Sequence, residues 1–320
     1  MKVSFIIPHK GRLEMLKETI VSILNLDYDQ NQIEIIVVSQ NDTLPISQLV
    51  ENDFNKQITV VLVDEKGTIS KSRNIGAAKA KGEYLAFLDA DIDLSTNWLV
   101  VMLEEMNRDK QRKIVSAYQV CADDAPELEK LRTELSNAEV DVNVKFLPGR
   151  NLFLHKDTFQ EVGGFPEHLV TCEDYFFTDK VDELGDLFYT SKASYVHLGE
   201  DKEWDQLFHK EIWRGQSNLK SLSGRNVPLR EYPSLLVPLW IFFFAITTSI
   251  SVLLGHIVMS FSSVLFIALP IFLYSQRLSR MAKRKIKFGI IVKFYLVYFA
   301  ARAIGTVVGL TKSFNVRNAA

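Results

Sequence analysis

The sequence predicts an α/β domain with a mostly parallel mixed sheet, followed by an α-helical membrane region. Short apolar runs rich in β-branched residues alternate with longer helical stretches, which is typical of βαβ units. The distribution of charged residues divides the chain into two parts. All 39 acidic residues lie in residues 1–231 together with 27 basic ones, whereas residues 232–320 hold no acidic residue and ten Lys or Arg. We therefore expect one α/β domain over 1–231 and a membrane region over 232–320.

The predicted strands are apolar runs that are too short to be helices. They are Val3–Ile7, Ile33–Val38, Ile58–Val63, Tyr84–Leu88, Lys113–Val120, Leu152–Leu154 and Ser194–Val196. Pro8 is expected to stop the first of them, because proline lacks the N–H that a strand ladder needs.

Helical spacing of apolar residues predicts the segments between the strands. The first two are Leu13–Leu26 and Thr68–Ala80, and Trp98–Met106 follows the fourth strand. Glu173 and Asp174 open another helical stretch. Pro126–Ala138 is charged but carries leucines on one face, so we expect it to pack as an insertion over the sheet.

Two apolar segments near the C-terminus predict a membrane hairpin. Residues 234–254 carry no charge and are long enough to span a hydrocarbon core of about 30 Å at about 1.5 Å per residue. Residues 257–274 follow after only Gly255 and His256. The loop 277–287 holds six Lys or Arg, so the positive-inside rule places it, and the N-terminal domain with it, in the cytoplasm.

The last apolar segment, 288–310, is long enough to span but contains Lys293 and Arg302. A charge at the bilayer centre costs about 2.5–3.5 kcal/mol or more. We expect an interfacial or partly inserted helix, and a third crossing stays open as the alternative. Gly305 and Gly309 form a small-xxx-small spacing that suits close helix packing.

The N-terminus and the cysteines agree with a cytoplasmic N-terminal domain. MKVSFIIPHKGR runs directly into a strand and turn without the apolar stretch of a signal peptide. Cys121 and Cys172 show no disulfide or metal-ligand pattern and are expected to be free thiols in a reducing compartment. The predicted location is the inner (cell) membrane.

Two carboxylates follow the strand Tyr84–Leu88 with one residue between them, Asp89 and Asp91. The carboxyl end of a buried strand is where open α/β sheets bind ligands. Paired carboxylates can hold a divalent cation, which neutralises a diphosphate. An acidic pair alone is far more typical of an ordinary polar turn than of a metal site.

The longer run S-x-S-R-N-x-G, five residues, then G-E-Y-L-A-F-L-D-A-D, resembles the nucleotide-sugar site of glycosyltransferase family 2. Its members are inverting enzymes with the GT-A fold. The resemblance begins at Ser4–Pro8, reaches Cys172-Glu173-Asp174 through Gly149-Arg150-Asn151 and Gly163-Gly164-Phe165, and covers roughly residues 3–220.

The resemblance implies a role for each matching residue. Asp91 would bind Mg²⁺ or Mn²⁺ with the help of Asp89, which also faces the donor. Asp174 would be the general base that activates an acceptor hydroxyl, with Glu173 raising its pKa or orienting it. The implied donor contacts are Pro8, Asp64, Arg73, Asn74 and Arg214, the implied acceptor-side residues are Gly149 and Asn151, and His197 is a further candidate for the metal or the diphosphate.

Structural alternatives stay open for several of these residues. Arg73 and Asn74 could cap or pair the start of their helix, Asp64 could be a solvated strand-end acid, and His197 could be structural. The Glu173-Asp174 pair could simply suit a helix N-terminus. Ser39-Gln40 stands where the family usually has an acid that reads the base, so the donor base stays open.

These residues together predict a membrane-anchored inverting glycosyltransferase that acts at the cytoplasmic face. Its partners would be a nucleotide-diphosphate sugar, a glycan or lipid-linked acceptor, membrane lipids and other glycan-assembly proteins, but no nucleic acid. One alternative is a non-catalytic scaffold in a polysaccharide-assembly complex. The other is a sugar nucleotidyltransferase, which Pro8-His9-Lys10-Gly11-Arg12 disfavours because it has only one glycine.

Overall fold

The computed structural model describes residues 2–45, 47, 49, 57–64, 66–216 and 232–317. The chain divides into two compact units. The first comprises Met1–Cys121 and Glu139–Gly199, and the second comprises Ala122–Ala138 and Glu200–Ala320. The boundary expected at residue 231 lies outside the described residues.

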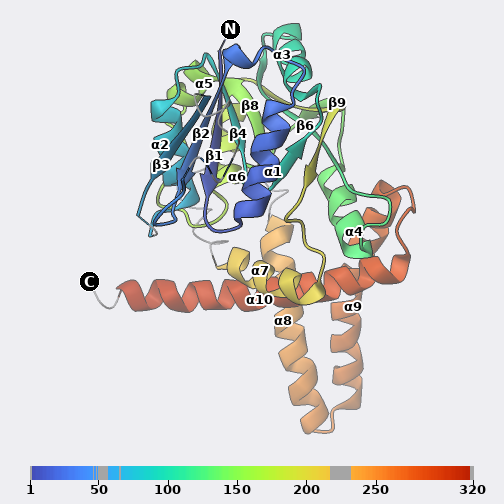
Figure 1. Cartoon of the computed structure of the whole chain (residues 1–320). Helices are drawn as coiled ribbons and strands as arrows, with labels where there is room; N and C mark the ends of the chain where they lie inside the picture. Colours follow the sequence, from blue (N-terminus) through green and yellow to red (C-terminus); the bar gives the residue numbers. More distant parts are fainter. Residues whose placement is uncertain are drawn as a thin grey trace. The chain divides into compact units, whose positions relative to one another are not determined.

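One mixed sheet forms the centre of the first unit (Figure 1). Its order within the described residues is β3-β2-β1-β4-β8-β6-β9-β5, with β7 paired to β9. The strands are β1 (Val3–His9), β2 (Ile33–Ser39), β3 (Ile58–Leu62), β4 (Tyr84–Leu88), β5 (Ile92–Leu94), β6 (Arg112–Val120), β7 (Val142–Val144), β8 (Asn151–His155) and β9 (Asp186–His197). Strands β3, β2, β1 and β4 pair in parallel, and β8 is antiparallel to β4. The predicted α/β class is confirmed.

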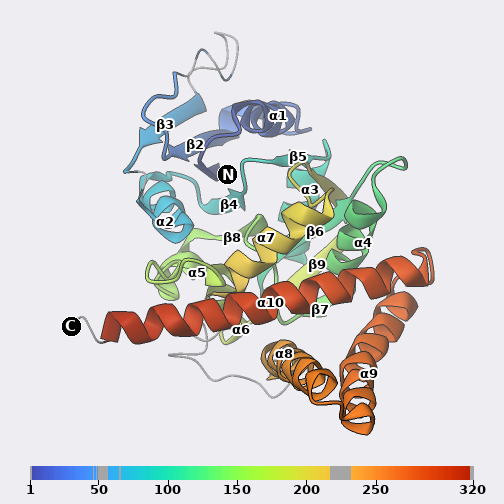
Figure 2. The ribbon, with the colours of Figure 1, turned by 90° about the horizontal axis from the view of Figure 1, so that it is seen from below.

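Helices cover both faces of this sheet and create two cores (Figure 2). The helices are α1 (Leu13–Leu24), α2 (Ile69–Lys79), α3 (Trp98–Arg108), α5 (Lys156–Glu161) and α6 (Glu173–Asp182). On one face, α1 and α3 bury side chains such as Ile20 and Trp98 against Phe5. On the other, α2, α5 and α6 pack against residues such as Phe87. Because successive side chains of a strand point to opposite faces of the sheet, the buried strands contribute apolar residues to both cores, as expected for a sheet covered on two sides.

The structure differs from expectation at Pro8, which lies inside β1 opposite Val38 instead of ending the strand. The pairing of β1 with β4 ends at Ile6 and Phe87. One edge of β1 therefore has no partner strand at Pro8, and the missing N–H is tolerated there.

The helix expected over the sheet, α4 (Glu127–Ser136), belongs to the second unit instead. Its buried Leu128 and Leu131 share a cluster with Leu207 of α7 (Trp204–Gly215) and with the C-terminal helices. The leucine face was predicted correctly, but the surface that it contacts was not.

The three remaining helices are α8 (Tyr232–Leu253), α9 (Ile257–Met281) and α10 (Phe288–Arg317). All three are long and apolar enough to cross a membrane. Helices α8 and α9 form the expected hairpin around Gly255, whose φ of 74° suits glycine. Helix α9 continues past residue 274, so Arg277 and Arg280 lie in its last turns and not in a loop. Within this unit α10 runs crosswise to the hairpin (Figures 1 and 2).

Candidate active site

The acidic pair lies at the carboxyl end of β4, in the middle of the sheet. Its backbone is fixed because Asp89 N–H donates to the Arg150 carbonyl at 3.1 Å. Asp91 is buried, whereas the side chain of Asp89 is 31% exposed. The two carboxylates therefore differ in solvent exposure: that of Asp89 is partly exposed, whereas that of Asp91 is enclosed.

Arg73 joins this pair to the second acidic pair. It lies on α2 and is fully buried. Its Nη2 donates to Asp89 Oδ1 at 2.9 Å and to the Gly149 carbonyl at 3.2 Å, and its Nη1 donates to Glu173 Oε1 at 2.9 Å. Burial lowers the pKa of Arg73, but the carboxylates of Asp89, Glu173 and Asp174 outweigh it and raise the pKa overall. The guanidinium is thus a fixed positive centre between two anionic segments.

Glu173 and Asp174 form the first turn of α6, after Cys172 in the left-handed region at φ 65°. Asp174 Oδ2 accepts from Gly149 N–H at 3.2 Å and Oδ1 accepts from Tyr175 N–H at 2.8 Å. Burial and the neighbouring Asp174 raise the pKa of Glu173 to about 7, against the opposing effect of Arg73. Glu173 is therefore held by Arg73, whereas the half-buried Asp174 is held by backbone donors.

Asp91 meets two cationic or potentially cationic groups. Arg12 Nη1 donates to its Oδ2 at 2.9 Å, and His197 Nε2 lies 3.5 Å from its Oδ1. His197 ends β9, which pairs with β5 directly after Asp91. Carboxylate oxygen and imidazole nitrogen together suit Mn²⁺, and carboxylate oxygen suits Mg²⁺. The predicted convergence of Asp91 and His197 is present.

Protein ligands alone would not complete such a site. Among the described residues, no group of three or more His, Cys, Asp or Glu side chains is arranged to hold a metal ion. A cation on Asp91 would thus take its other ligands from the donor and from water, as Mg²⁺ commonly does at phosphates.

The predicted donor side lies at the ends of β1, β2 and β3. Gln40, which replaces the expected acid, is buried and donates to the Gly67 carbonyl at 2.8 Å. Asp64 accepts from Lys66 N–H at 3.1 Å and lines a cavity of about 220 Å³. The other lining residues are Lys66, Gly67, Thr68, Lys71 and Glu167. Gln40 thus holds Gly67, one of the residues that line this cavity, and the lining contains both acidic and basic side chains.

Asn74 ties α2 to the Gly-Gly-Phe turn. Its Nδ2 donates to the Phe165 carbonyl and its Oδ1 accepts from Phe165 N–H, both at 2.9 Å. A Cβ at Gly164 would lie 2.8 Å from Asn74 Oδ1, so the turn needs glycine there. These contacts favour the structural alternative for Asn74, as the buried ion pairs do for Arg73.

Asn151 adjoins the acidic pair on β8, whereas Arg214 belongs to the second unit. Asn151 is fully buried on β8 opposite Leu88, and its amide has no hydrogen-bond partner among the described residues. Arg214 belongs to the second unit, where its Nη1 donates to the buried Glu211 at 2.5 Å. Arg214 therefore has a strong partner within its own unit.

Sequence reasoning missed Arg12 as a site residue. The signal was present in Gly11-Arg12, which follows the first strand as Asp91 follows the fourth. The carboxyl ends of parallel neighbours meet at one edge of a sheet, so the two residues could have been paired from the strand order.

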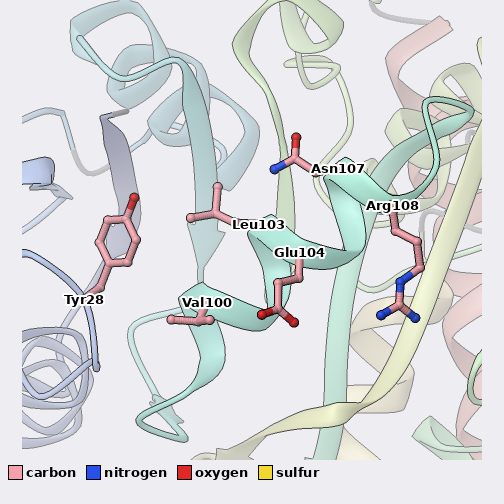
Figure 3. A pocket seen from close by; sticks show the side chains of 6 residues that line it. All are labelled: Tyr28, Val100, Leu103, Glu104, Asn107 and Arg108. Atoms are coloured by element: carbon pink, nitrogen blue, oxygen red, sulfur yellow. The ribbon is translucent and has the colours of Figure 1, made fainter.

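Another cavity is separate from these residues. It measures about 580 Å³ and lies beside α3, where Leu103 and Val100 face Tyr28 (Figure 3). Its other lining residues are Glu104, Asn107 and Arg108. It shares no residue with the site, so its size does not make it the place of the chemistry.

Comparison with known proteins gives a consistent result. Residues 4–163, half of the chain, match the family described as "Glycosyl transferase family 2". Glycosyltransferase AglE of Haloferax volcanii is 24% identical over 247 residues, which cover 75% of this chain and 79% of that protein. The probable glycosyltransferase YdaM of Bacillus subtilis is 24% identical over 67% of this chain and 53% of its own length.

The fold is also shared with a solved structure, the mannosyltransferase PcManGT from Pyrobaculum calidifontis in complex with GDP-Man and Mn²⁺. The TM-score is 0.63 over 97% of this chain and 87% of that one, at 16% sequence identity. This likeness confirms the GT-A type of α/β fold expected from the sequence.

Proposed function

The chain belongs to glycosyltransferase family 2 and uses a nucleotide-sugar donor, and we propose that it transfers the sugar with inversion to an acceptor hydroxyl at the cytoplasmic membrane face. The observation that carries this proposal is the Asp89–Arg73–Glu173 chain of ion pairs. It brings the donor-side and acceptor-side acidic pairs, 82 residues or more apart in sequence, to one place in the fold.

Asp174 is the general base of the proposed reaction. An inverting displacement needs one base opposite the leaving group and no covalent intermediate. Glu173 is buried and bonded to Arg73, so it is poorly placed to take a proton from an acceptor. Asp174 is more accessible, and the Gly149 and Tyr175 N–H groups aim its carboxylate. Proton removal by a positioned base contributes about 10²–10⁴-fold to a rate.

Asp91 is the main protein ligand of the proposed Mg²⁺ or Mn²⁺, with His197 and Asp89 close by. When bound, the cation would supply positive charge to the leaving diphosphate. The Mn²⁺ named with the mannosyltransferase structure supports this assignment. Pro8 and Asp64, at the ends of β1 and β3, would contact the nucleotide near the cavity of about 220 Å³.

Helices α8 and α9 are the two proposed membrane crossings. Helix α10 is proposed to lie along the membrane surface, because it follows α7 along its length. Lys293 Nζ lies 4.2 Å from the Trp204 ring centre, Arg302 Nε donates to Glu211 Oε2 at 2.6 Å, and a Cβ at Gly305 would meet the Ile212 carbonyl at 2.3 Å.

A crossing by α10 would carry α7 into the hydrocarbon. On α7 the side chains of Asp205 and His209 are 85% and 71% exposed. Away from Gly305, α10 instead exposes the apolar Leu296 and Ile304. Buried charges and an exposed apolar stripe suit an interfacial helix with water on the α7 side and lipid on the other.

Labelling with an impermeant maleimide tests this topology. Single cysteines at Thr311, Asp205 and Gly255 would be placed in a chain that lacks Cys121 and Cys172. We expect Thr311→Cys to react on the same side as Asp205→Cys and opposite Gly255→Cys. Reaction of Thr311→Cys on the Gly255 side would establish a third crossing.

The reaction itself is tested on the full chain in nanodiscs. UDP, GDP and dTDP would be screened by thermal shift with Mn²⁺, and sugars on the stabilising nucleotide would be tried with membrane lipid extract as acceptor. NMR of the product should show an anomeric configuration opposite to that of the donor. Retained configuration would reject the single-displacement mechanism. Nucleotide binding without transfer for every donor would favour the scaffold alternative.

A further inference from the structure

The ion pair between Arg12 and Asp91 is asymmetric. The Asp91 side chain is 9% exposed, whereas that of Arg12 is 54% exposed. Arg12 Nη1 reaches Asp91 Oδ2 at 2.9 Å from the loop between β1 and α1. The carboxylate is therefore enclosed, and the guanidinium approaches it from the solvent side, where it can leave without disturbing the core.

The surrounding backbone is shaped to allow this contact. Gly11 and Arg12 both have left-handed backbones, with φ of 63° and 49°. An arginine rarely adopts such a conformation, so the loop holds it at a cost that other contacts offset. Opposite, a Cβ at Gly199 would lie 2.1 Å from Asp91 Oδ2 and 2.9 Å from Arg12 Nη1. Only glycine leaves room for both groups there.

The same carboxylate cannot fully serve Arg12 and a metal ion together. Arg12 holds only Oδ2, but a Mg²⁺ bound at about 2.0–2.1 Å from either oxygen of Asp91 would still lie within a few ångströms of the guanidinium. At that separation the repulsion is strong in a partly buried site. Metal binding to Asp91 must therefore weaken or displace the Arg12 contact.

We propose that Arg12 is an exchangeable counterion of the metal site, which neutralises Asp91 in the free enzyme and moves to the donor's diphosphate when a divalent cation takes Asp91. This inference rests on the proposed function, because it assumes that Asp91 binds the cation. The planar guanidinium suits phosphate oxygens, to which it can donate two hydrogen bonds. Arg12 thus binds the donor's diphosphate when the metal is bound and pairs with the metal-binding carboxylate of Asp91 when it is not.

The proposal implies that the metal ion and the nucleotide bind cooperatively. A cation without nucleotide must displace Arg12 into water, whereas a cation with a diphosphate gives Arg12 a new anionic partner. Each ligand therefore strengthens the binding of the other by the same factor. Replacing Arg12 by a neutral residue should improve binding of the metal alone and reduce this coupling.

Binding of Mn²⁺ alone, followed by EPR of the free aqueous ion, tests the proposal on the full chain in nanodiscs. We expect Arg12→Gln to bind Mn²⁺ about tenfold more tightly than wild type. The increase in Mn²⁺ affinity caused by saturating nucleoside diphosphate should shrink by a similar factor. Lys17→Gln on α1, which removes an exposed pair with Glu14, is the matched control and should change neither quantity.

Several outcomes are decisive. Unchanged or weaker Mn²⁺ binding by Arg12→Gln would overturn the proposal, whereas Arg12→Lys, which keeps the charge, should resemble wild type. If Arg12→Gln fails to fold, Arg12→Gly serves instead, because glycine tolerates the left-handed backbone. Asp91→Asn should abolish Mn²⁺ binding. If Asp91→Asn keeps it, the metal assignment in the proposed function has failed, separately from the counterion.

Discussion

Arg73 Nη1 donates to Glu173 Oε1 across 2.9 Å, and so connects α2 to α6 over a hundred positions of sequence. Because Arg73 also holds Asp89, the donor-side and acceptor-side acids share one buried cation. The geometry of the whole site thus depends on a residue that is itself nearly inaccessible.

Removing this cation should destabilise the first unit. Arg73→Met leaves the buried Glu173 carboxyl and the Gly149 carbonyl without their hydrogen-bond donor, and a buried polar group that loses its partner typically costs about 1–3 kcal/mol. The unfolding temperature should fall clearly, whereas Lys71→Met, an exposed position on the same helix, should change little. Arg73→Met/Glu173→Gln should recover part of the loss. A wild-type unfolding temperature for Arg73→Met would contradict this account of the ion pairs.

Glu173 should make the protein less stable as pH rises. Burial and Asp174 raise its folded pKa to about 7 from 4.5, so the folded chain binds more protons than the unfolded chain between these values. Stability is full below about pH 4.5 and falls as pH increases through about 7. Glu173→Gln should flatten the unfolding temperature across this range. Equal pH profiles for both proteins would show that Glu173 is ionised throughout.

The contact between α7 and α10 should depend on a glycine. A Cβ at Gly305 would lie 2.3 Å from the Ile212 carbonyl, while one at Gly289 on the same helix meets nothing within 4 Å. Gly305→Val should therefore cost about 1–3 kcal/mol through overpacking, seen as a lower unfolding temperature in nanodiscs. Gly289→Val is the control. Equal unfolding temperatures for the two variants would mean that α10 does not pack closely on α7.

The sequence predicted structure best where a short pattern of residues fits only one kind of local structure. The buried run Tyr84–Leu88 followed by Asp89 predicted a central strand with an acid at its carboxyl end, because few other structures tolerate that pattern. Gly305 and Gly309 likewise predicted close helix packing. Both expectations rest on local chemistry, which sequence displays directly.

Partners distant in sequence were not predictable in the same way. The leucines of α4 would fit any apolar surface, so nothing in them distinguished the sheet from α7 and α10. The family resemblance placed Arg73 at the donor, and its pairing with carboxylates 16 and 100 residues away was not predictable from the sequence. Arg12 was missed because its contact with Asp91 depends on β1 and β4 being neighbours in the sheet and on a left-handed backbone that arginine rarely adopts.

Release of nucleoside diphosphate by Asp174→Asn and Asp91→Asn, measured with the preferred donor and Mn²⁺, tests both acidic pairs together. We predict that each variant loses about 10²–10⁴-fold in rate and keeps the wild-type unfolding temperature. Asp174→Asn should still bind the nucleotide with Mn²⁺, and Asp182→Asn at the other end of α6 should stay active. Wild-type rates in Asp174→Asn and Asp91→Asn would show that the two acidic pairs do not form a glycosyl-transfer site.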